Sequence, residues 1–360
     1  MNASDVIMGL SAGRELPHPR AENWRWTDLH GAIRKAAPAQ IAASALRVTQ
    51  GEMGQKVATA TTGFADIPPM PDSIGWLAKA LAGEPLCIEL NETPPMPFWV
   101  HGAGQNGLCG SHLQMRVGHG VHVVLVEHAS TKSTGFQLDL REFMVEPGGR
   151  LTRILLNHNN PQGARHHQSE VMVGAGGRYS QFVLDFGASF SRVETHVQPQ
   201  GPRAQISLSG AYLLDGTDKV DMTSKVRHDH LAGTTRQLVK GVVMGQADAV
   251  FQGKFHVART GQHTDAKMGH HCLLLSDMAK VHAKPELEIY ADDVACAHGN
   301  TTGALDEAAL FYMRQRGLSL AAAKALLVRA FVTEVFEELN DEALQTQILS
   351  AIENWLEPRL

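Results

Sequence analysis

Cys296 and His298 are the residues of this sequence whose types and spacing best suit metal chemistry. They lie in a short stretch of alternating character that begins at Val294 and is predicted to end at Gly299-Asn300. A period of two residues indicates a strand, in which Cys296 and His298 share one face about 7 Å apart. Iron and zinc accept a thiolate and an imidazole but normally take four ligands. The pair is therefore a fragment of a metal site, and from spacing alone a core thiol beside an unrelated histidine is the more ordinary interpretation.

A glycine-rich stretch, Gly102-Ala-Gly104-Gln-Asn-Gly107, has the spacing of a dinucleotide-binding loop. That motif requires a helix after the third glycine. Here further glycines interrupt the next residues, and Leu113, Met115 and Val117 alternate as in a strand. We therefore predict a loop between strands. The sequence has no phosphate-binding loop that ends in Gly-Lys-Ser/Thr, so an ATPase activity would have to come from another protein.

The sequence has 19 histidines and 4 cysteines, but neither residue type forms a complete ligand set. The pairs His166-His167 and His270-His271 are adjacent, and neighbours on a strand point to opposite faces. We expect most histidines to be surface or hydrogen-bonded structural residues. The cysteines are scattered without a Cys-x-x-Cys motif, which predicts neither a disulfide framework nor a structural zinc site and is typical of a reducing compartment.

Composition narrows the class of protein. The chain has 360 residues, 43% of them hydrophobic, and a net charge of −5, which predicts a globular protein. No run of lysine or arginine indicates nucleic-acid binding. The first ten residues lack the features of a signal peptide, and no segment is apolar enough to cross a bilayer. We expect a cytoplasmic protein without nucleic-acid or membrane partners.

The organisation changes twice along the chain, which predicts helical residues 1–82, a β region over 83–300 and helical residues 301–360. The β region contains a repeat, since Gly148-Gly-Arg-Leu-Thr-Arg-Ile-Leu-Leu156 aligns with Gly176-Gly-Arg-Tyr-Ser-Gln-Phe-Val-Leu184 after a shift of 28 residues. Such a period without intervening helices favours a solenoid of stacked coils, with residues such as Leu184 pointing inward. A sandwich of short strands is the competing architecture.

The two helical regions are expected to cap the ends of the solenoid. In the first, Trp24 and Trp26 are predicted to anchor the helices onto the rest of the protein. In the last, the predicted buried positions recur at spacings of three and four residues: Leu320, Leu327, Phe331, Val335, Leu339, Leu344, Ile348, Ile352 and Trp355. Residues 331–357 also contain seven acidic and no basic residues, which indicates a solvated face or a surface for a basic partner.

The residues around Cys296 resemble the C-terminal signature of a known family, the SufB/SufD components of the SUF iron–sulfur cluster assembly machinery. The resemblance covers residues 284–294, Cys296-Ala-His298-Gly299, Leu305-Asp-Glu307 and residues 310–314, with weaker matches at 24–29 and 273–277. It implies a mainly β fold, a right-handed parallel β-helix flanked by N- and C-terminal helical domains.

The resemblance also implies a function and partners. Cys296 and His298 fall where SufD members have their functional cysteine and histidine, which implies a transient site for iron or a nascent iron–sulfur cluster shared with SufB. The C-terminal helices are expected to bind SufC, an ABC-type ATPase, so the chain itself is expected to be non-catalytic and to hold no cofactor when isolated. A homodimer is expected in the absence of SufB.

Two alternatives remain open from the sequence. The chain could be the SufB paralogue, although it lacks a cysteine-rich cluster before the β region. It could also be a β-helix enzyme acting on a carbohydrate or acyl substrate. Such an enzyme lines a groove with aromatic and acidic residues, whereas aromatic residues make up only 6% of this chain.

Overall fold

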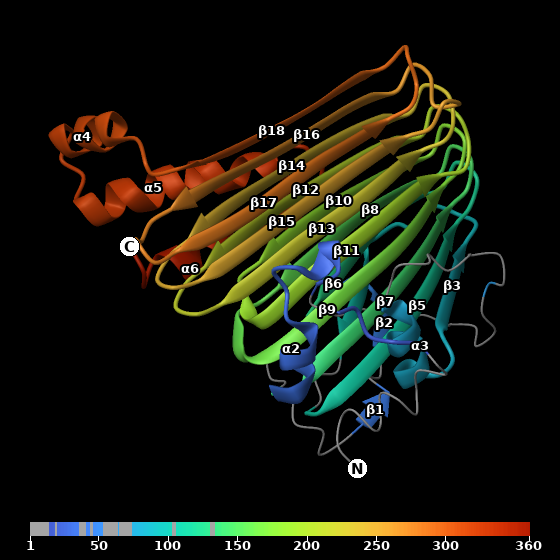
Figure 1. The fold of residues 1–360 in the computed structure, drawn as a ribbon, viewed down its shortest axis with the longest axis horizontal. Helices are drawn as coiled ribbons and strands as arrows, with labels where there is room; N and C mark the ends of the chain where they lie inside the picture. Colours follow the sequence, from blue (N-terminus) through green and yellow to red (C-terminus); the bar gives the residue numbers. More distant parts are fainter. Residues whose placement is uncertain are drawn as a thin grey trace.

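The protein is a parallel β-solenoid, as predicted, with helices near both ends of the chain (Figure 1). The computed structural model describes residues 14–18, 20–35, 41–43, 46–52, 64, 74–102, 106–129 and 134–360. Within these residues the strands form two nine-stranded sheets, and from β4 (Phe98–Gly102) onward the chain alternates between them. Each coil therefore gives one strand to each sheet, which excludes the sandwich.

Sheet A contains the odd-numbered strands. One of them, β3 (Leu86–Leu90), lies beside the main order of the sheet and pairs with β5 (Leu108–Val117). Its main order is β1 (Ile41–Ala43), β5 (Leu108–Val117), β7 (Phe136–Val145), β9 (Asn160–Val173), β11 (Ala188–Pro199), β13 (Lys219–His228), β15 (Asp248–Val257) and β17 (Lys280–Ile289).

Sheet B contains the even-numbered strands. Its order is β18 (Ala295–Gly303), β16 (Asp265–Leu274), β14 (Thr234–Val243), β12 (Gln205–Leu214), β10 (Arg178–Asp185), β8 (Arg150–Asn157), β6 (His122–His128), β4 (Phe98–Gly102) and β2 (Leu46–Gln50). Only β2 is antiparallel to its neighbour, β4, within the described strands.

The predicted repeat is the register of two neighbouring coils. Strand β8 pairs with β10 so that Ile154 lies beside Phe182 and Leu156 beside Leu184, the same offset that the sequence alignment gave. Gly148 and Gly176 occupy the equivalent corner before each strand and both have positive φ, 67° and 63°. A glycine adopts this left-handed conformation without a steric penalty, which explains its recurrence at the corner.

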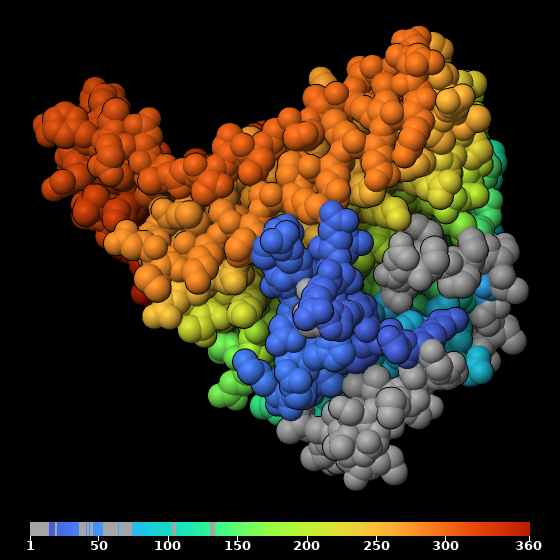
Figure 2. Space-filling model, in the orientation of Figure 1, coloured from blue at the N-terminus to red at the C-terminus, as the bar shows by residue number. Residues whose placement is uncertain are grey.

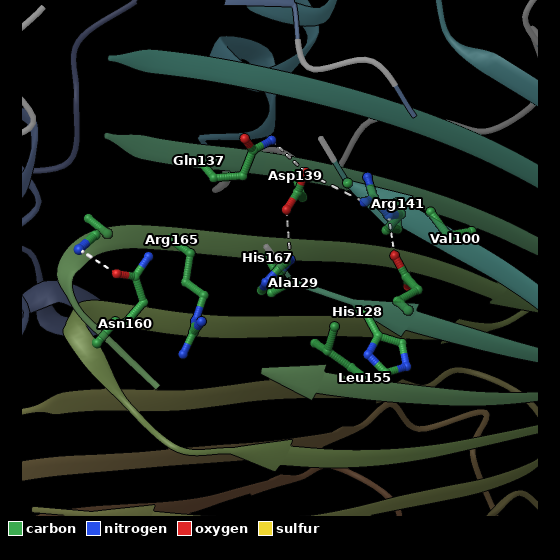
Figure 3. Close-up of a pocket in the computed structure, with 15 residues that line it drawn as sticks. Val100, His128, Ala129, Gln137, Asp139, Arg141, Leu155, Asn160, Arg165 and His167 are labelled. Carbon is green, nitrogen blue, oxygen red and sulfur yellow. Dashed lines mark hydrogen bonds and ion pairs between the residues drawn. The ribbon is translucent and has the colours of Figure 1, made fainter. Parts of the chain in front are cut away.

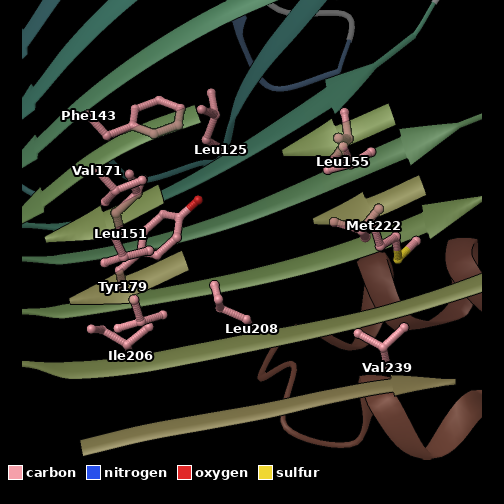
Figure 4. Packing of buried hydrophobic residues seen from close by; sticks show 14 of the residues in the cluster. Leu125, Phe143, Leu151, Leu155, Val171, Tyr179, Ile206, Leu208, Met222 and Val239 are labelled. Atoms are coloured by element: carbon pink, nitrogen blue, oxygen red, sulfur yellow. The ribbon is translucent and has the colours of Figure 1, made fainter. Parts of the chain in front are cut away.

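Apolar side chains fill the space between the sheets (Figure 4). Phe143 and Val171 from sheet A meet Leu151, Tyr179 and Leu208 from sheet B in this core. Each coil can bury these side chains only against its neighbours, so the solenoid depends on stacking.

Leu184 does not belong to this inner core, contrary to the prediction. It lies on the outer face of sheet B, in a second cluster that the C-terminal helices cover. These helices are α5 (Leu320–Thr333), the short 3₁₀ helix η2 (Glu334–Phe336) and α6 (Glu342–Leu356). Phe182 packs on Phe336, and Phe186 stacks on Trp355 with ring centroids 6.3 Å apart. Sheet B is thus apolar on both faces in this region, and alternation could not indicate which face is inside.

The N-terminal segment covers the outer face of sheet A. Its elements are η1 (Glu22–Trp24), α2 (Leu29–Lys35) and α3 (Gly75–Ala82). Trp24 is buried, and the Arg192 guanidinium lies 4.0 Å from the centre of its ring; Trp26 stacks on His282. The anchoring role predicted for the two tryptophans is therefore confirmed. The strands β1 and β2, which the sequence did not reveal, lie in the same part of the chain.

The helices cover faces of the sheets and do not cap the C-terminal end of the solenoid, contrary to expectation. Strands β17 and β18 are the last strands of their sheets, and each pairs with one neighbour on one side only. At the other end, β1, β2, β3 and α3 lie against the first coils. No helix in the described part of the chain combines the length and apolarity needed to span a membrane.

Candidate functional site at the open end of the solenoid

Cys296 and His298 lie on β18, the edge strand of sheet B. Cys296 is beside Ala266 of β16, and His298 is beside Met268. Cys296 is half-buried and packs against the inner core, whereas His298 is exposed. Because they are two residues apart in one strand, both share one face, as predicted, and this is the inner face of the sheet. The strand does not end at Gly299-Asn300, however; it continues to Gly303.

We call the two edge strands, β17 and β18, the open end. Their residues are half-buried or exposed, whereas those of β13 and β15 are mostly buried. Just beyond β17, the Tyr290 side chain is 58% exposed. An edge of this length presents unpaired backbone N–H and C=O groups, which is a template for pairing with another chain.

The pair cannot form a closed metal site by itself. The inward side chains of β17 that face it, Val281, Ala283 and Leu287, are apolar. Among the described residues no three His, Cys, Asp or Glu side chains converge as metal ligands would. Burial raises the pKa of the Cys296 thiol, so the isolated chain holds it protonated. The two side chains are therefore two candidate ligands, too few for a full set, on the inner face of an edge strand.

Asn300, on the same face of β18, is a polar neighbour that sequence reasoning missed. Its side-chain oxygen lies 2.6 Å from Nδ1 of His270, and Nε2 of His270 lies 2.8 Å from the Tyr212 hydroxyl. The sequence pointed to His270 only as half of an adjacent pair with His271. His271 instead contacts Thr301, so the two histidines diverge as predicted. If the strand had been predicted to continue past Gly299, Asn300 would have been expected on the same face as Cys296 and His298.

Inside the first coils a cavity of about 30 Å³, lined by both charged and apolar residues, has space for roughly two water molecules (Figure 3). Glu127 accepts hydrogen bonds from both Arg141 and Arg153, and His167 contacts Asp139 at 3.0 Å. Burial alone would raise the pKa of Glu127, but the two guanidinium groups lower it to about 2. These charges neutralise one another, so the cavity is a structural ion-pair network that links the two sheets.

The other sequence motifs have structural roles. His166 points to the outer face, where it contacts Glu194 at 3.3 Å and Trp24, so His166 and His167 diverge as predicted. In the glycine-rich motif, Gly102 ends β4 and β5 begins directly after Gly107, which confirms a strand and not a helix at this point. Gly104 lies outside the described residues.

A second exposed surface lies on the C-terminal helices. Helix α4 (Glu307–Gln315) and the start of α5 project from the solenoid (Figure 2). The side chains of Phe311 and Tyr312 are 67% and 59% exposed, and Leu320 is also exposed although it was predicted to be buried. Leu344, Ile348, Ile352 and Trp355 of α6 are buried as predicted. An exposed apolar cluster on a projecting helix is typical of a protein-binding surface.

The acidic residues predicted near this surface are only partly available. Glu334 is paired with Lys240, and Arg329 contacts Glu353 at 2.9 Å. Glu342 and Glu357 are exposed. Glu337 and Glu338 are exposed too, so the acidic face and the apolar cluster on α4 and α5 are both open to solvent.

Comparison with known proteins gives consistent results. The family model described as "SUF system FeS cluster assembly, SufBD core domain" matches residues 100–331, which include Cys296 and His298. The chain is 26% identical to the iron–sulfur cluster assembly protein SufD of Escherichia coli over 375 aligned positions, covering 94% of this chain and 88% of that protein. A SufBD family protein of Mycobacterium tuberculosis is 26% identical and covers 95% of this chain and 90% of its own length. The chloroplastic protein ABCI7 of Arabidopsis thaliana is 32% identical, over 60% of this chain and 46% of that protein.

Proposed function

Because the chain belongs to the SufBD core family of the SUF iron–sulfur cluster assembly system, we propose that it is a SufD-like subunit of the assembly scaffold. In this proposal it works in the cytoplasm and has no catalytic activity of its own. Cys296 and His298 supply half of the ligands for a nascent cluster, and SufB supplies the rest. The cluster is the cargo of the complex.

The observation that supports this proposal most strongly is the position of the two residues at the open end. A partner strand that paired with β18 would extend sheet B and bring its own side chains next to His298. Sulfur and nitrogen ligands are those that iron accepts, and a partner is needed because two ligands do not close a site. A second copy of the chain could occupy the same edge when SufB is absent.

The apolar cluster on α4 and α5 supports a separate contact with the ATPase SufC. Phe311 and Tyr312 are exposed on α4, and this helix projects from the solenoid (Figure 2), so a partner could cover them without disturbing the core. Movement of the ATPase would be transmitted through α5, which packs on sheet B. We infer that ATP-driven motion opens or closes the shared site at the open end.

Substitution of His298 by alanine tests the site. His298 is exposed, so His298→Ala should leave the melting temperature and the association with SufB unchanged, while the maturation of iron–sulfur enzymes is lost in cells that have no other assembly system. His122→Ala is the control, because His122 is exposed on β6, far along sheet B from the open end. Normal maturation with His298→Ala would show that this histidine is not a site residue.

The ATPase contact requires point substitutions, because deletion of residues 306–360 would uncover the outer face of sheet B. Phe311→Asp should abolish co-purification with SufC and leave the melting temperature unchanged. Glu342→Lys, on the exposed acidic face, is the control and should retain binding. If Glu342→Lys weakens binding and Phe311→Asp does not, the acidic face is the contact.

A further inference from the structure

A chain of hydrogen bonds runs across the inner face of sheet B from the buried core to the open end. It begins at Tyr212 on β12, passes to His270 on β16 and ends at Asn300 on β18, with contacts of 2.8 Å and 2.6 Å. Tyr212 and His270 are completely buried. Asn300 is exposed, so the chain connects the core to the edge.

The fold makes space for this chain at Gly241. Tyr212 is beside Gly241 of β14, and Gly241 is beside Cys272 of β16. A Cβ atom at Gly241 would lie 2.0 Å from the Tyr212 ring, so only glycine lets the ring cross β14 and reach His270. Phe251 of sheet A stacks on His270 with ring centroids 4.5 Å apart and planes 3° apart, which fixes the imidazole.

The direction of the hydrogen bonds follows from the protonation states. Burial lowers the pKa of His270 to about 4, so its ring is neutral and has one N–H group. The side-chain oxygen of Asn300 faces Nδ1, so the neutral ring donates from Nδ1 and presents the lone pair of Nε2 to the Tyr212 hydroxyl, which also contacts the Cys272 sulfur. Burial raises the pKa of Tyr212 well above its usual value, which keeps that proton in place.

The consequence is a fixed orientation of the Asn300 amide. Its oxygen is engaged with His270, and its NH₂ group has no partner among the described residues. Asn300 is two residues from His298 on the same face of β18, about 7 Å along the strand. An oriented hydrogen-bond donor therefore stands beside the proposed ligands at the open end.

We propose that Asn300 is a third residue of the site, held by His270 and Tyr212, and that its NH₂ group donates a hydrogen bond to an anionic sulfur, a sulfide or thiolate of the nascent cluster. This inference rests on the proposed function. Hydrogen bonds to cluster sulfurs stabilise their negative charge and tune the cluster. His270 and Tyr212 are positioning residues, because they act through Asn300.

The test uses the chain in complex with SufB, loaded with ferrous iron and sulfide, and follows the decay of cluster absorbance. Asn300→Asp keeps an oxygen for His270 and removes the donor, and we expect the cluster to decay at least threefold faster, with a changed absorption spectrum. Asn300→Ala removes the donor without adding a charge and should act in the same direction. Tyr212→Phe removes the hydroxyl that faces Nε2 of His270, so the imidazole can adopt its other tautomer. We expect this variant to speed the decay of the cluster less than the Asn300 variants do.

Two controls separate the outcomes. Tyr179→Phe removes another buried hydroxyl, which donates to Gln181 at 2.8 Å, and should leave the decay unchanged. His298→Ala tests the underlying site. If His298→Ala loses the cluster while Asn300→Asp and Asn300→Ala retain it as the unaltered chain does, Asn300 has no part in the site. If His298→Ala also retains it, the proposed function itself is wrong.

Discussion

Substitution of Gly176 by alanine tests whether the corners fix the coil geometry. Gly176 has φ of 63°, and a Cβ atom built on it meets nothing within 4 Å, so the only effect on the folded state is conformational. The left-handed conformation costs an L-residue roughly 1–2 kcal/mol. Alanine recovers about 0.4–1 kcal/mol of this by restricting the unfolded chain. The net expectation for Gly176→Ala is a destabilisation of about 1 kcal/mol.

The reverse substitution provides the matched comparison. Ala232 occupies the equivalent corner before β14, with φ of 56°, so Ala232→Gly should relieve the strain and stabilise the protein by up to about 1 kcal/mol. Gly303→Ala is the control, because Gly303 has no positive φ and no atom near its Cβ position. Urea unfolding at constant m-value measures all three. If Gly176→Ala and Gly303→Ala have the same effect, the left-handed corner does not limit stability.

Three further outcomes follow from buried or capping side chains. Leu184→Asp should destabilise by several kcal/mol, because the charge would be buried between sheet B and the C-terminal helices; unchanged urea unfolding would show that this interface opens easily. Although burial opposes the charged form, Glu170 and Glu194 raise the pKa of His196 to about 10. The stabilisation by His196 should therefore be complete below the unfolded pKa of about 6.5 and be lost as pH rises to about 10, and His196→Gln should flatten the pH profile of the unfolding free energy in that range. Asp306 caps α4 by accepting from the backbone of Ala308, so Asp306→Ala should cost about 1 kcal/mol of helix stability and weaken binding of SufC, while Asp306→Asn should retain both.

The repeat could be predicted only from the coils whose corners contain glycine. Before β8 and β10 the left-handed corner residue is glycine, and the alignment was visible there. Before β12, β14 and β16 the same conformation is adopted by Arg203, Ala232 and His263. The backbone geometry persists, but the residue type that signals it does not. Stacking on the preceding coil imposes the conformation on these residues, and a single sequence contains no local mark of that effect.

The inner and outer faces were harder to assign than the strands themselves. Leu184 was predicted to point inward, and it is indeed buried, but in the cluster beneath the C-terminal helices and not within the solenoid. Strands that are covered on both faces have apolar residues at both odd and even positions. The sequence pattern therefore indicates a strand without indicating which of its faces is the inner one. The resemblance, and not the periodicity, singled out Cys296 and His298, and their role as ligands stays a prediction. Asn300 was missed because Gly299-Asn300 resembles the end of a strand.

The accessibility of the proposed site results from where the solenoid stops. Ala266 and Met268 of β16 occupy the same register positions as Cys296 and His298, one coil earlier, and both are buried in the inner core. One further coil would bury Cys296 and His298 in the same way. Ending the solenoid at β18 instead exposes inward-facing side chains together with unpaired backbone groups. A partner that continues the sheet must therefore contact these side chains as it pairs with the backbone, which couples assembly of the complex to assembly of the site.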